Sequence, residues 1–182
     1  MILTDEHIDY ENNCRKMFVG EIIRGVIYGE IQYVFEDNEN LIPEPSYFTK
    51  YPEIDTLDHS IYFQMTNKII YVFWDNTFFS YGLLSKEIDL EKTPNDHEQK
   101  WNVSNDEKWI NLIGQKIIDF KINWEEASSI YPQTFLLQIE NGKTIILSAS
   151  EFKDSEQNKV YGMSDNLLVT TNLTLAKELK IT

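Results

Sequence analysis

The sequence contains little cysteine and no long hydrophobic run. Cys14 is the only cysteine among 182 residues, so the chain cannot form an internal disulfide, and a cytoplasmic setting is expected. No stretch approaches the roughly 20 apolar residues that a membrane-spanning helix needs. The first residues, MILTDEHIDYE, are acidic where a secretory signal would be basic and then apolar. We therefore expect a cytoplasmic protein that does not enter a membrane.

Basic residues are also scarce. The chain holds 16 Lys and Arg residues against 30 Asp and Glu residues, a net charge of -14. The imbalance lies in the first half, because residues 1–91 hold 17 acidic and 6 basic residues, against 13 and 10 in residues 92–182. Nucleic acid binding requires a positive stripe, which no Lys/Arg cluster supplies, so nucleic acid is not expected as a partner. An acidic surface favours a basic protein partner, although acidity can also serve only to keep a protein in solution.

Hydrophobic residues are plentiful and alternate with polar ones. They make up 42% of the chain, and its length suits one domain, residues 1–182, with a buried core. In KIIDFKINW, residues 116–124, the alternation places Ile118, Phe120, Ile122 and Trp124 on one face of a half-buried strand. This pattern predicts that the protein is built mainly from strands.

Two hairpins are predicted from turn residues between apolar runs. TFLLQIENGKTIILSAS, residues 134–150, contains Asn141-Gly142, a pair that favours a type I′ turn. SIYFQMTNKIIYVFW, residues 60–74, would turn at Thr66-Asn67. Further strands are expected within residues 25–35 and 166–171. The sheet should be mainly antiparallel and curved.

Three helices are expected, which makes the fold class α+β. The first runs from Thr4 toward Val19 and stops at Gly20. The second covers residues 104–114, with a capping box of Ser104 and Glu107 and an end at Gly114. The last covers residues 173–181, capped by Asn172 or Thr174. Residues 40–53, rich in proline, should be an irregular connection, and residues 89–108 a surface link.

The two halves of the chain share a faint repeat. Gly20-x-x-Ile23 has the spacing of Gly114-x-x-Ile117, and each pair follows an expected helix. IYFQMTN, residues 61–67, also aligns with FLLQIEN, residues 135–141. The spacing predicts two pseudo-repeated α-β-β-β units, residues 4–90 and 104–171, whose strands could join into one sheet. Chance similarity between amphipathic hairpins is the alternative.

No catalytic or metal-binding set emerges from the motifs. Glu125 and Glu126 follow Trp124, but neighbours in a strand point to opposite faces, so they cannot converge on one substrate. We expect the chain to leave the sheet there and both carboxylates to lie in solvent or to contact a partner. Gly142-Lys143-Thr144 lacks the upstream glycine of a phosphate loop and is expected to be a turn.

The remaining titratable candidates are isolated in the sequence. His7, His59 and His97 are scattered without the spacing of metal ligands and are expected at the surface. Nearby carboxylates should raise the pKa of Cys14 and keep its thiol unreactive. We therefore expect no cofactor, no metal and no enzymatic activity.

Aromatic residues gather in YVFWDNTFFSYGLL, residues 71–84. The segment holds more rings than one face of a strand can bury. Some rings must be covered by helices or form an apolar patch for a partner. Trp74 beside Asp75 would suit a protein interface.

The order of elements in residues 101–180 resembles that of a bacterial family of immunity proteins from polymorphic-toxin loci. The resembling elements are Trp109 before LIG, Gly114-x-x-Ile117, the strand ending in WEE, YPQTFLLQIENG, ILSASEF and LLVTTNLTLAKEL. The resemblance implies a small acidic cytoplasmic protein that binds and neutralises a cognate toxin without catalysis. Complementary charge would speed the capture of a basic toxin.

The residues predicted to contact a partner are acidic or aromatic residues of expected loops and strand ends. They are Glu36, Asp37, Glu39, Glu44, Glu53, Asp55, Asp58, Trp74, Asp75, Glu125 and Glu126. Two other functions stay open: a different protein-interaction or regulatory module, and a carbohydrate-active enzyme that uses tryptophan and carboxylates. The sequence does not indicate an oligomeric state.

Overall fold

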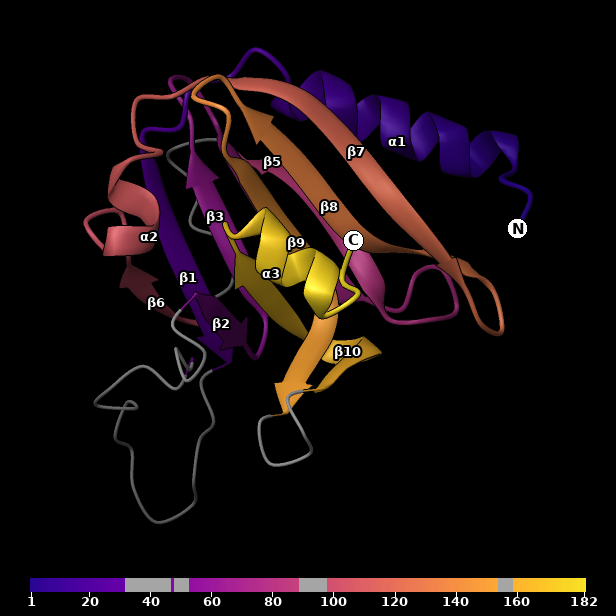
Figure 1. Cartoon of the computed structure of the whole chain (residues 1–182). Coiled ribbons are helices and arrows are strands. Elements are labelled where there is room, and N and C mark those ends of the chain that lie inside the picture. Colours follow the sequence, from indigo (N-terminus) through magenta and orange to yellow (C-terminus); the bar gives the residue numbers. More distant parts are fainter. Residues whose placement is uncertain (32–46, 48–52, 89–97, 154–158) are drawn as a thin grey trace.

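The strands form two antiparallel sheets that pack face to face (Figure 1). The computed structural model describes residues 1–31, 47, 53–88, 98–153 and 159–182. The elements are α1 (Asp5–Phe18), β1 (Gly25–Ile31), β2 (Ile54–Leu57), β3 (Ser60–Gln64), β4 (Ile69–Asp75), β5 (Gly82–Ile88), β6 (Glu98–Asn102), α2 (Glu107–Ile110), β7 (Ile117–Glu126), β8 (Ile130–Ile139), β9 (Thr144–Lys153), β10 (Lys159–Thr170) and α3 (Leu173–Glu178). The expected class, α+β with mainly antiparallel strands, is confirmed.

The strand order explains where the core lies. Sheet 1 has the order β5-β4-β3-β1-β6, and sheet 2 has the order β2-β10-β9-β8-β7. Phe63 of sheet 1 and Phe135 of sheet 2 are fully buried in one shared cluster, together with Phe18 of α1 and Trp109 of α2. The strands therefore form a two-layered sandwich instead of a single curved sheet, because both inner faces are apolar.

Strand β7 follows the predicted alternation except at its bulges. Phe120, Ile122 and Trp124 are buried as expected, but Ile118 is 45% exposed. A register shift between Ile117 and Asp119 turns the Ile118 side chain outward, and Ile117 is buried instead.

The expectation that the chain leaves the sheet after Trp124 is wrong. Strand β7 continues to Glu126, which pairs with Ile130 of β8. A second register shift, between Asn123 and Trp124, places the extra residue on β8, at Gln133. Both Glu125 and Glu126 are exposed at the end of β7.

Both predicted hairpins form. Met65 N–H donates to Lys68 O over 2.8 Å and closes the turn at Thr66-Asn67. In the β8–β9 hairpin Gly142 has φ +84°, but Asn141 does not have positive φ, so the turn is not type I′. The N–H of Ile139 instead pairs with Lys143 O, and Gly142 supplies the single left-handed residue of a longer loop.

The three helices lie where expected, with different ends. Helix α1 begins after Thr4, whose backbone N–H donates to His7 Nδ1. Helix α2 is shorter than predicted and follows Asp106. Ser104 does not cap it, since its Oγ accepts a hydrogen bond from Val26 N–H of β1. Asn172 caps α3 through Leu175 N–H, one of the two predicted options.

Two further sequence expectations concern connections and membrane helices. Residues 98–102 form β6 at the edge of sheet 1, so they are not the surface link that the sequence suggested. Residues 89–97, like most of the proline-rich connection 40–53, lie outside the described residues. None of the described helices has the length and apolar character needed to cross a bilayer.

The two halves have matching architectures. In each half a helix is followed by a four-stranded meander, β1-β3-β4-β5 or β7-β8-β9-β10, one strand more than predicted. Gly20 N–H donates to Ile117 O, and the equivalent Gly114 N–H donates to Ile23 O, each over 2.8 Å. These reciprocal bonds relate the units by a local two-fold axis. Among the strands that the structure describes, β2 and β6 have no counterpart in that relation.

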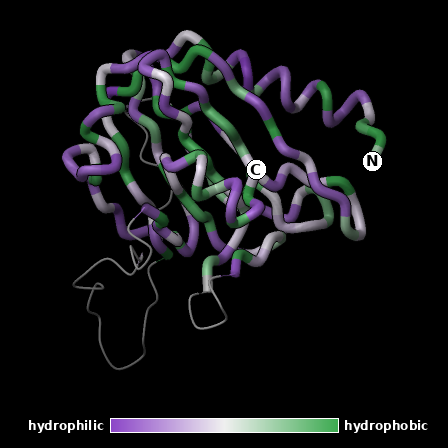
Figure 2. The backbone as a smooth tube through the Cα atoms, viewed as in Figure 1, coloured by the Kyte–Doolittle hydropathy of each residue, from purple (hydrophilic) through white to green (hydrophobic). Residues whose placement is uncertain are grey.

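Helix α1 closes one open side of the sandwich, between the edge strands β5 and β7. It is mostly hydrophilic, with hydrophobic residues at intervals (Figure 2). Tyr10 OH donates to Leu83 O of β5 over 2.9 Å, and Arg15 donates to Phe120 O of β7 over 2.8 Å. Cys14 is 1% exposed, and burial raises its pKa, with a smaller contribution from Glu11. The predicted direction is confirmed, but burial is the main cause.

Candidate protein-interaction surface

Two loops meet at the end of the sandwich near the N-terminus of α1 (Figure 1). They are the β4–β5 loop, residues 76–81, and the β7–β8 loop, residues 127–129. Ser129 Oγ donates to Phe78 O, and Ser80 and Ser129 share a hydrogen bond of 3.0 Å between their hydroxyls. Ser128 Oγ lies 3.5 Å from Phe79 O. The serines of one loop therefore fix the backbone of the other.

The β4–β5 loop turns one phenylalanine inward and the next outward. Phe78 contacts the rings of His7, Tyr10 and Trp124, with centroids 5.4–5.8 Å from its own. Phe79 is 88% exposed and has φ +57°. A bulky residue in the left-handed region is strained, and such strain persists only where the surroundings impose it. The loop therefore holds a large apolar side chain in solvent in a fixed conformation.

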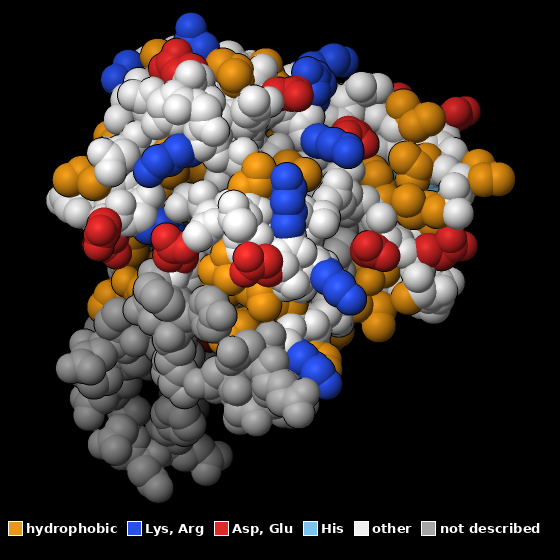
Figure 3. Space-filling view, in the orientation of Figure 1, with side chains coloured by type: hydrophobic (Ala, Val, Ile, Leu, Met, Phe, Trp, Pro, Cys, Tyr) orange, Lys and Arg blue, Asp and Glu red, His pale blue; other side chains and the backbone are white. Residues whose placement is uncertain are grey.

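Apolar and acidic side chains surround this loop pair. Met1 and Ile2 are 63% and 88% exposed, and Met1 N lies 3.4 Å from Glu126 Oε2. Figure 3 shows hydrophobic side chains at this edge of the molecule with acidic side chains beside them. We name this region the Phe79 surface and define it as Met1, Ile2, Asp75, Phe79, Tyr81, Glu125 and Glu126.

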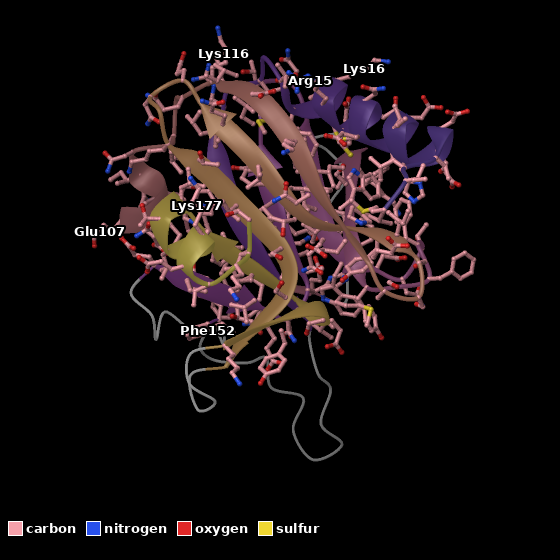
Figure 4. The ribbon with its side chains drawn as sticks, turned by 45° about the vertical axis from the view of Figure 1, so that its right-hand side comes forward. Arg15, Lys16, Glu107, Lys116, Phe152 and Lys177 are labelled. Atoms are coloured by element: carbon pink, nitrogen blue, oxygen red, sulfur yellow. The ribbon has the colours of Figure 1, made fainter. Side chains whose placement is uncertain are left out.

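Charge differs between the two ends of α1. Its first turn carries Asp5 and Glu6, next to the Phe79 surface, and its last turn carries Arg15 and Lys16. Figure 4 shows Arg15, Lys16 and Lys116 along one edge, where α1 ends and β7 begins. Lys and Arg side chains are also spread over the face seen in Figure 3. The acidic excess is thus not uniform, and the Phe79 end is one place where it appears.

Three of the predicted contact residues come together beside the Phe79 surface. Trp74 Nε1 donates to Asp58 O over 2.7 Å, and its ring meets Tyr81 edge-on at 5.5 Å. Asp75 Oδ1 accepts from Thr77 N–H over 2.7 Å and fixes the start of the loop. Asp58, Trp74 and Asp75 are all half-buried. Only part of each side chain is therefore open to a partner.

Glu125 and Glu126 belong to the Phe79 surface itself, whereas the six remaining predicted contact residues are not among those that form it. Glu36, Asp37, Glu39 and Glu44 lie outside the described residues. Glu53 is exposed and accepts a hydrogen bond from Asn172, far from the Phe79 surface. Asp55 is 3% exposed, forms an ion pair of 2.5 Å with Lys108 and accepts from Tyr28 OH over 2.6 Å. The expectation that Asp55 contacts a partner is wrong, because its carboxylate is used inside the protein.

Sequence reasoning missed a buried polar cluster on the outer face of sheet 1. The Glu98 side chain is 1% exposed, and its carboxylate accepts hydrogen bonds from His59, Ser60, Tyr62 and Tyr71. Burial acts to raise the pKa of Glu98, but the bonds from His59, Tyr62 and Ser60 outweigh it and lower the pKa. Glu98 is therefore a buried charge that is stabilised by its donors.

Two of the three histidines are not surface residues. His7 is 9% exposed, and the His59 side chain is 17% exposed, whereas His97 lies outside the described residues. No local pattern indicated the Glu98 cluster, because His59 and Glu98 are 39 positions apart in sequence. Within the described ranges, no group of three or more His, Cys, Asp or Glu side chains could hold a metal ion.

Comparison with known proteins adds no relative: no family model matches the chain, and no curated protein and no solved structure matches it. The interpretation of the site therefore rests on its geometry and charge.

Proposed function

We propose that the chain is a non-enzymatic binding protein that captures a basic protein partner through the Phe79 surface. Together with the resemblance to immunity proteins, this leads us to propose that the partner is a cognate bacterial toxin, neutralised in the cytoplasm. The observation that carries the proposal is Phe79, 88% exposed and held in a strained backbone conformation by a second loop. Exposed aromatic anchors of this kind dominate the energy of many protein interfaces.

The charges around Phe79 support a basic partner. Asp75, Glu125 and Glu126 surround an apolar centre formed by Phe79, Met1 and Ile2. An apolar centre with a charged rim is the common anatomy of a protein interface, and the rim charges mainly set the association rate. An immunity protein benefits from fast capture, because a free toxin acts while it is unbound.

The test uses the toxin module encoded by the neighbouring reading frame and two substitutions. Phe79→Asn removes the ring, and asparagine tolerates the left-handed conformation, so the loop should stay folded. Ile110→Asn is the matched control, because Ile110 is a 54% exposed hydrophobic residue on α2, at the other side of the molecule. We expect Phe79→Asn to weaken binding about 30-fold or more and to abolish growth rescue. Full rescue by Phe79→Asn, or equal losses in both variants, would contradict the proposal.

A second test addresses the charges. The double variant Glu125→Gln and Glu126→Gln should lower the association rate about ten-fold at low salt, with little change in the dissociation rate. The control, Glu107→Gln with Glu178→Gln, removes the same charge from α2 and α3. Stopped-flow measurements at two salt concentrations give the association rate and the dissociation rate of each double variant. Equal rates in both double variants would exclude the Phe79 surface as the site of charge steering.

A further inference from the structure

A pocket of about 500 Å³ lies beside the Phe79 surface on the outer face of sheet 1. Asp75 belongs to both the surface and the pocket, so the two are continuous. The residues that line the pocket, which we name the His59 pocket, are His59, Tyr71, Phe73, Trp74, Asp75, Lys86, Glu87 and Ile88. Its volume suits a single large side chain or a small ligand.

Aromatic rings form the walls of the His59 pocket. Tyr71 stacks on Phe73 with centroids 4.6 Å apart, and Trp74 meets the His59 ring edge-on at 5.5 Å. The faces of such rings carry negative electrostatic potential and attract cations. The walls therefore favour a flat or cationic group over an anion.

The charges at the pocket favour a cation as well. Asp75 lines it, and the buried Glu98 carboxylate lies behind His59. Glu87 also borders it, but Glu87 stands opposite the core residue Ile70, and its carboxylate pairs with Lys68 over 3.1 Å on the other face of β5. Of the lining residues only Lys86 is a permanent cation, and its Nζ lies 4.9 Å from the centroid of the Phe73 ring. The chain thus places one of its own cations on this wall. Because Lys86 is exposed, its side chain can move into solvent when another cation arrives.

His59 adds a directed acceptor. Its Nδ1 is bonded to the Glu98 carboxylate, so in the neutral imidazole Nδ1 carries the hydrogen and Nε2 carries a lone pair. A carboxylate that holds a histidine in one tautomer also fixes the orientation of its ring. The pocket therefore combines aromatic faces, the Asp75 carboxylate and an acceptor of fixed orientation.

We propose that the His59 pocket receives the guanidinium group of an arginine side chain from the basic partner. This inference rests on the proposed function and names the chemistry of one contact. Arginine fits better than lysine, because its planar and weakly hydrated group stacks on rings while its N–H groups bond carboxylates. In the complex, the arginine replaces Lys86 against Phe73 and directs N–H groups to Asp75 and His59.

The test titrates the isolated protein with N-acetyl-L-arginine amide and follows the indole N–H signal of Trp74 by NMR. N-acetyl-L-citrulline amide has nearly the same shape without the charge and should bind at least ten-fold more weakly. Lys86→Met should strengthen arginine binding several-fold because it removes the internal competitor. Asp75→Asn, which can still accept the hydrogen bond from Thr77 N–H, should weaken it several-fold.

Three results would overturn the proposal. They are no shift at Trp74, equal binding of the arginine and citrulline compounds, and arginine binding that Lys86→Met weakens or leaves unchanged. Free L-arginine that binds ten-fold more tightly than the blocked amide would assign the pocket to the amino acid and not to a protein side chain. None of these outcomes affects the toxin assays with Phe79→Asn, so failure of the pocket and failure of the proposed function can be told apart.

Discussion

Glu98 is a buried carboxylate whose charge depends on its hydrogen-bond donors. Its folded pKa is lowered, so its contribution to stability is complete above the ordinary carboxyl pKa of about 4.3. The contribution is lost as the pH falls through the lower, folded value. We expect Glu98→Gln to reduce the free energy of unfolding by about 2 kcal/mol at neutral pH, because charged hydrogen bonds are lost.

Urea denaturation between pH 3 and 7 measures this effect. The difference between wild type and Glu98→Gln should shrink toward low pH. Glu178→Gln, at an exposed position of α3, is the control and should change little. A difference that is constant with pH would exclude the charge of Glu98 as the cause.

Asp58 shows the opposite behaviour. Burial raises its pKa to about 6, although the hydrogen bond from Ile31 N–H opposes this rise. Glu30 and Glu98 raise the pKa further, and His59 lowers it. Its ionisation therefore costs stability, which is present below the ordinary pKa and lost as the pH rises through about 6. Asn at this position can still accept the bond from Ile31 N–H.

We therefore expect wild type to lose stability relative to Asp58→Asn as the pH rises from about 4 to about 6. Denaturation of both proteins across this range tests the sign directly. If wild type instead gains stability over Asp58→Asn across that window, the pKa of Asp58 is not raised. NMR titration of the Asp58 carboxyl carbon measures its pKa independently.

At the scale of single elements, helix α1 protects two sheet edges with polar side chains. Tyr10 OH donates to Leu83 O and accepts from Ser85 N–H, so it pairs two backbone groups of the edge strand β5. Edge strands with unpaired groups are sites of wrong association. Burial raises the pKa of Tyr10, so its hydroxyl stays protonated and able to donate.

We expect Tyr10→Phe to lower the free energy of unfolding by about 1–3 kcal/mol, because it leaves two partly buried backbone groups without this partner. Hydrogen exchange at Ser85 N–H should accelerate more than exchange in the central strands. Tyr81→Phe, in the exposed β4–β5 loop, is the matched control. Unchanged exchange at Ser85 would mean that the hydroxyl does not protect β5.

Alternation predicted most strands, because each has one apolar face toward the core. It missed β2, β5 and β6. The last of these has the sequence EQKWN, lies at the edge of sheet 1 and has little apolar content. It also misplaced Ile118, because a bulge leaves no mark in a single sequence. The aromatic run of residues 71–84 indicated more rings than one strand face can bury, and in the structure Phe73 is buried while Phe79 is exposed. Its sequence could not show that Phe78 turns inward and Phe79 outward, since serines of a distant loop decide this.

The Glu98 cluster could not be predicted for a different reason. Glu98 meets its donors only because β6 pairs with β1 and β1 pairs with β3, which brings Ser60 and Tyr62 beside it. Such pairing between distant strands is not encoded in local patterns. The position of Asp55 could not be predicted for the same reason. Its acidic neighbours in the sequence suggested an exposed side chain, but its strand β2 pairs with β10, and its carboxylate forms an ion pair with Lys108.

At the scale of the whole molecule, Gly20 and Gly114 occupy equivalent positions in the two units. Both have positive φ, +95° and +85°, and neither has an atom within 4 Å of where a Cβ would stand. Alanine at either position should therefore cost only backbone strain, about 1–2 kcal/mol. Asparagine should cost less at both, because it tolerates this conformation.

Thermal or urea denaturation of the four variants tests this symmetry. We expect Gly20→Ala and Gly114→Ala to lower stability by similar amounts, and the two Asn variants to recover part of each loss. If one alanine variant loses several-fold more stability than the other, the two turns are not equivalent in energy, even though their hydrogen bonds match.

The unmatched strand β2 also determines when the fold can form during synthesis. Strand β2 belongs to the first half of the chain, yet its partner is β10, near the other end. On the ribosome, residues 54–57 must therefore wait until about residue 170 has emerged before they gain a neighbour in the sheet. The first half cannot mature early as a finished unit, and completion of the sandwich depends on the emergence of β10.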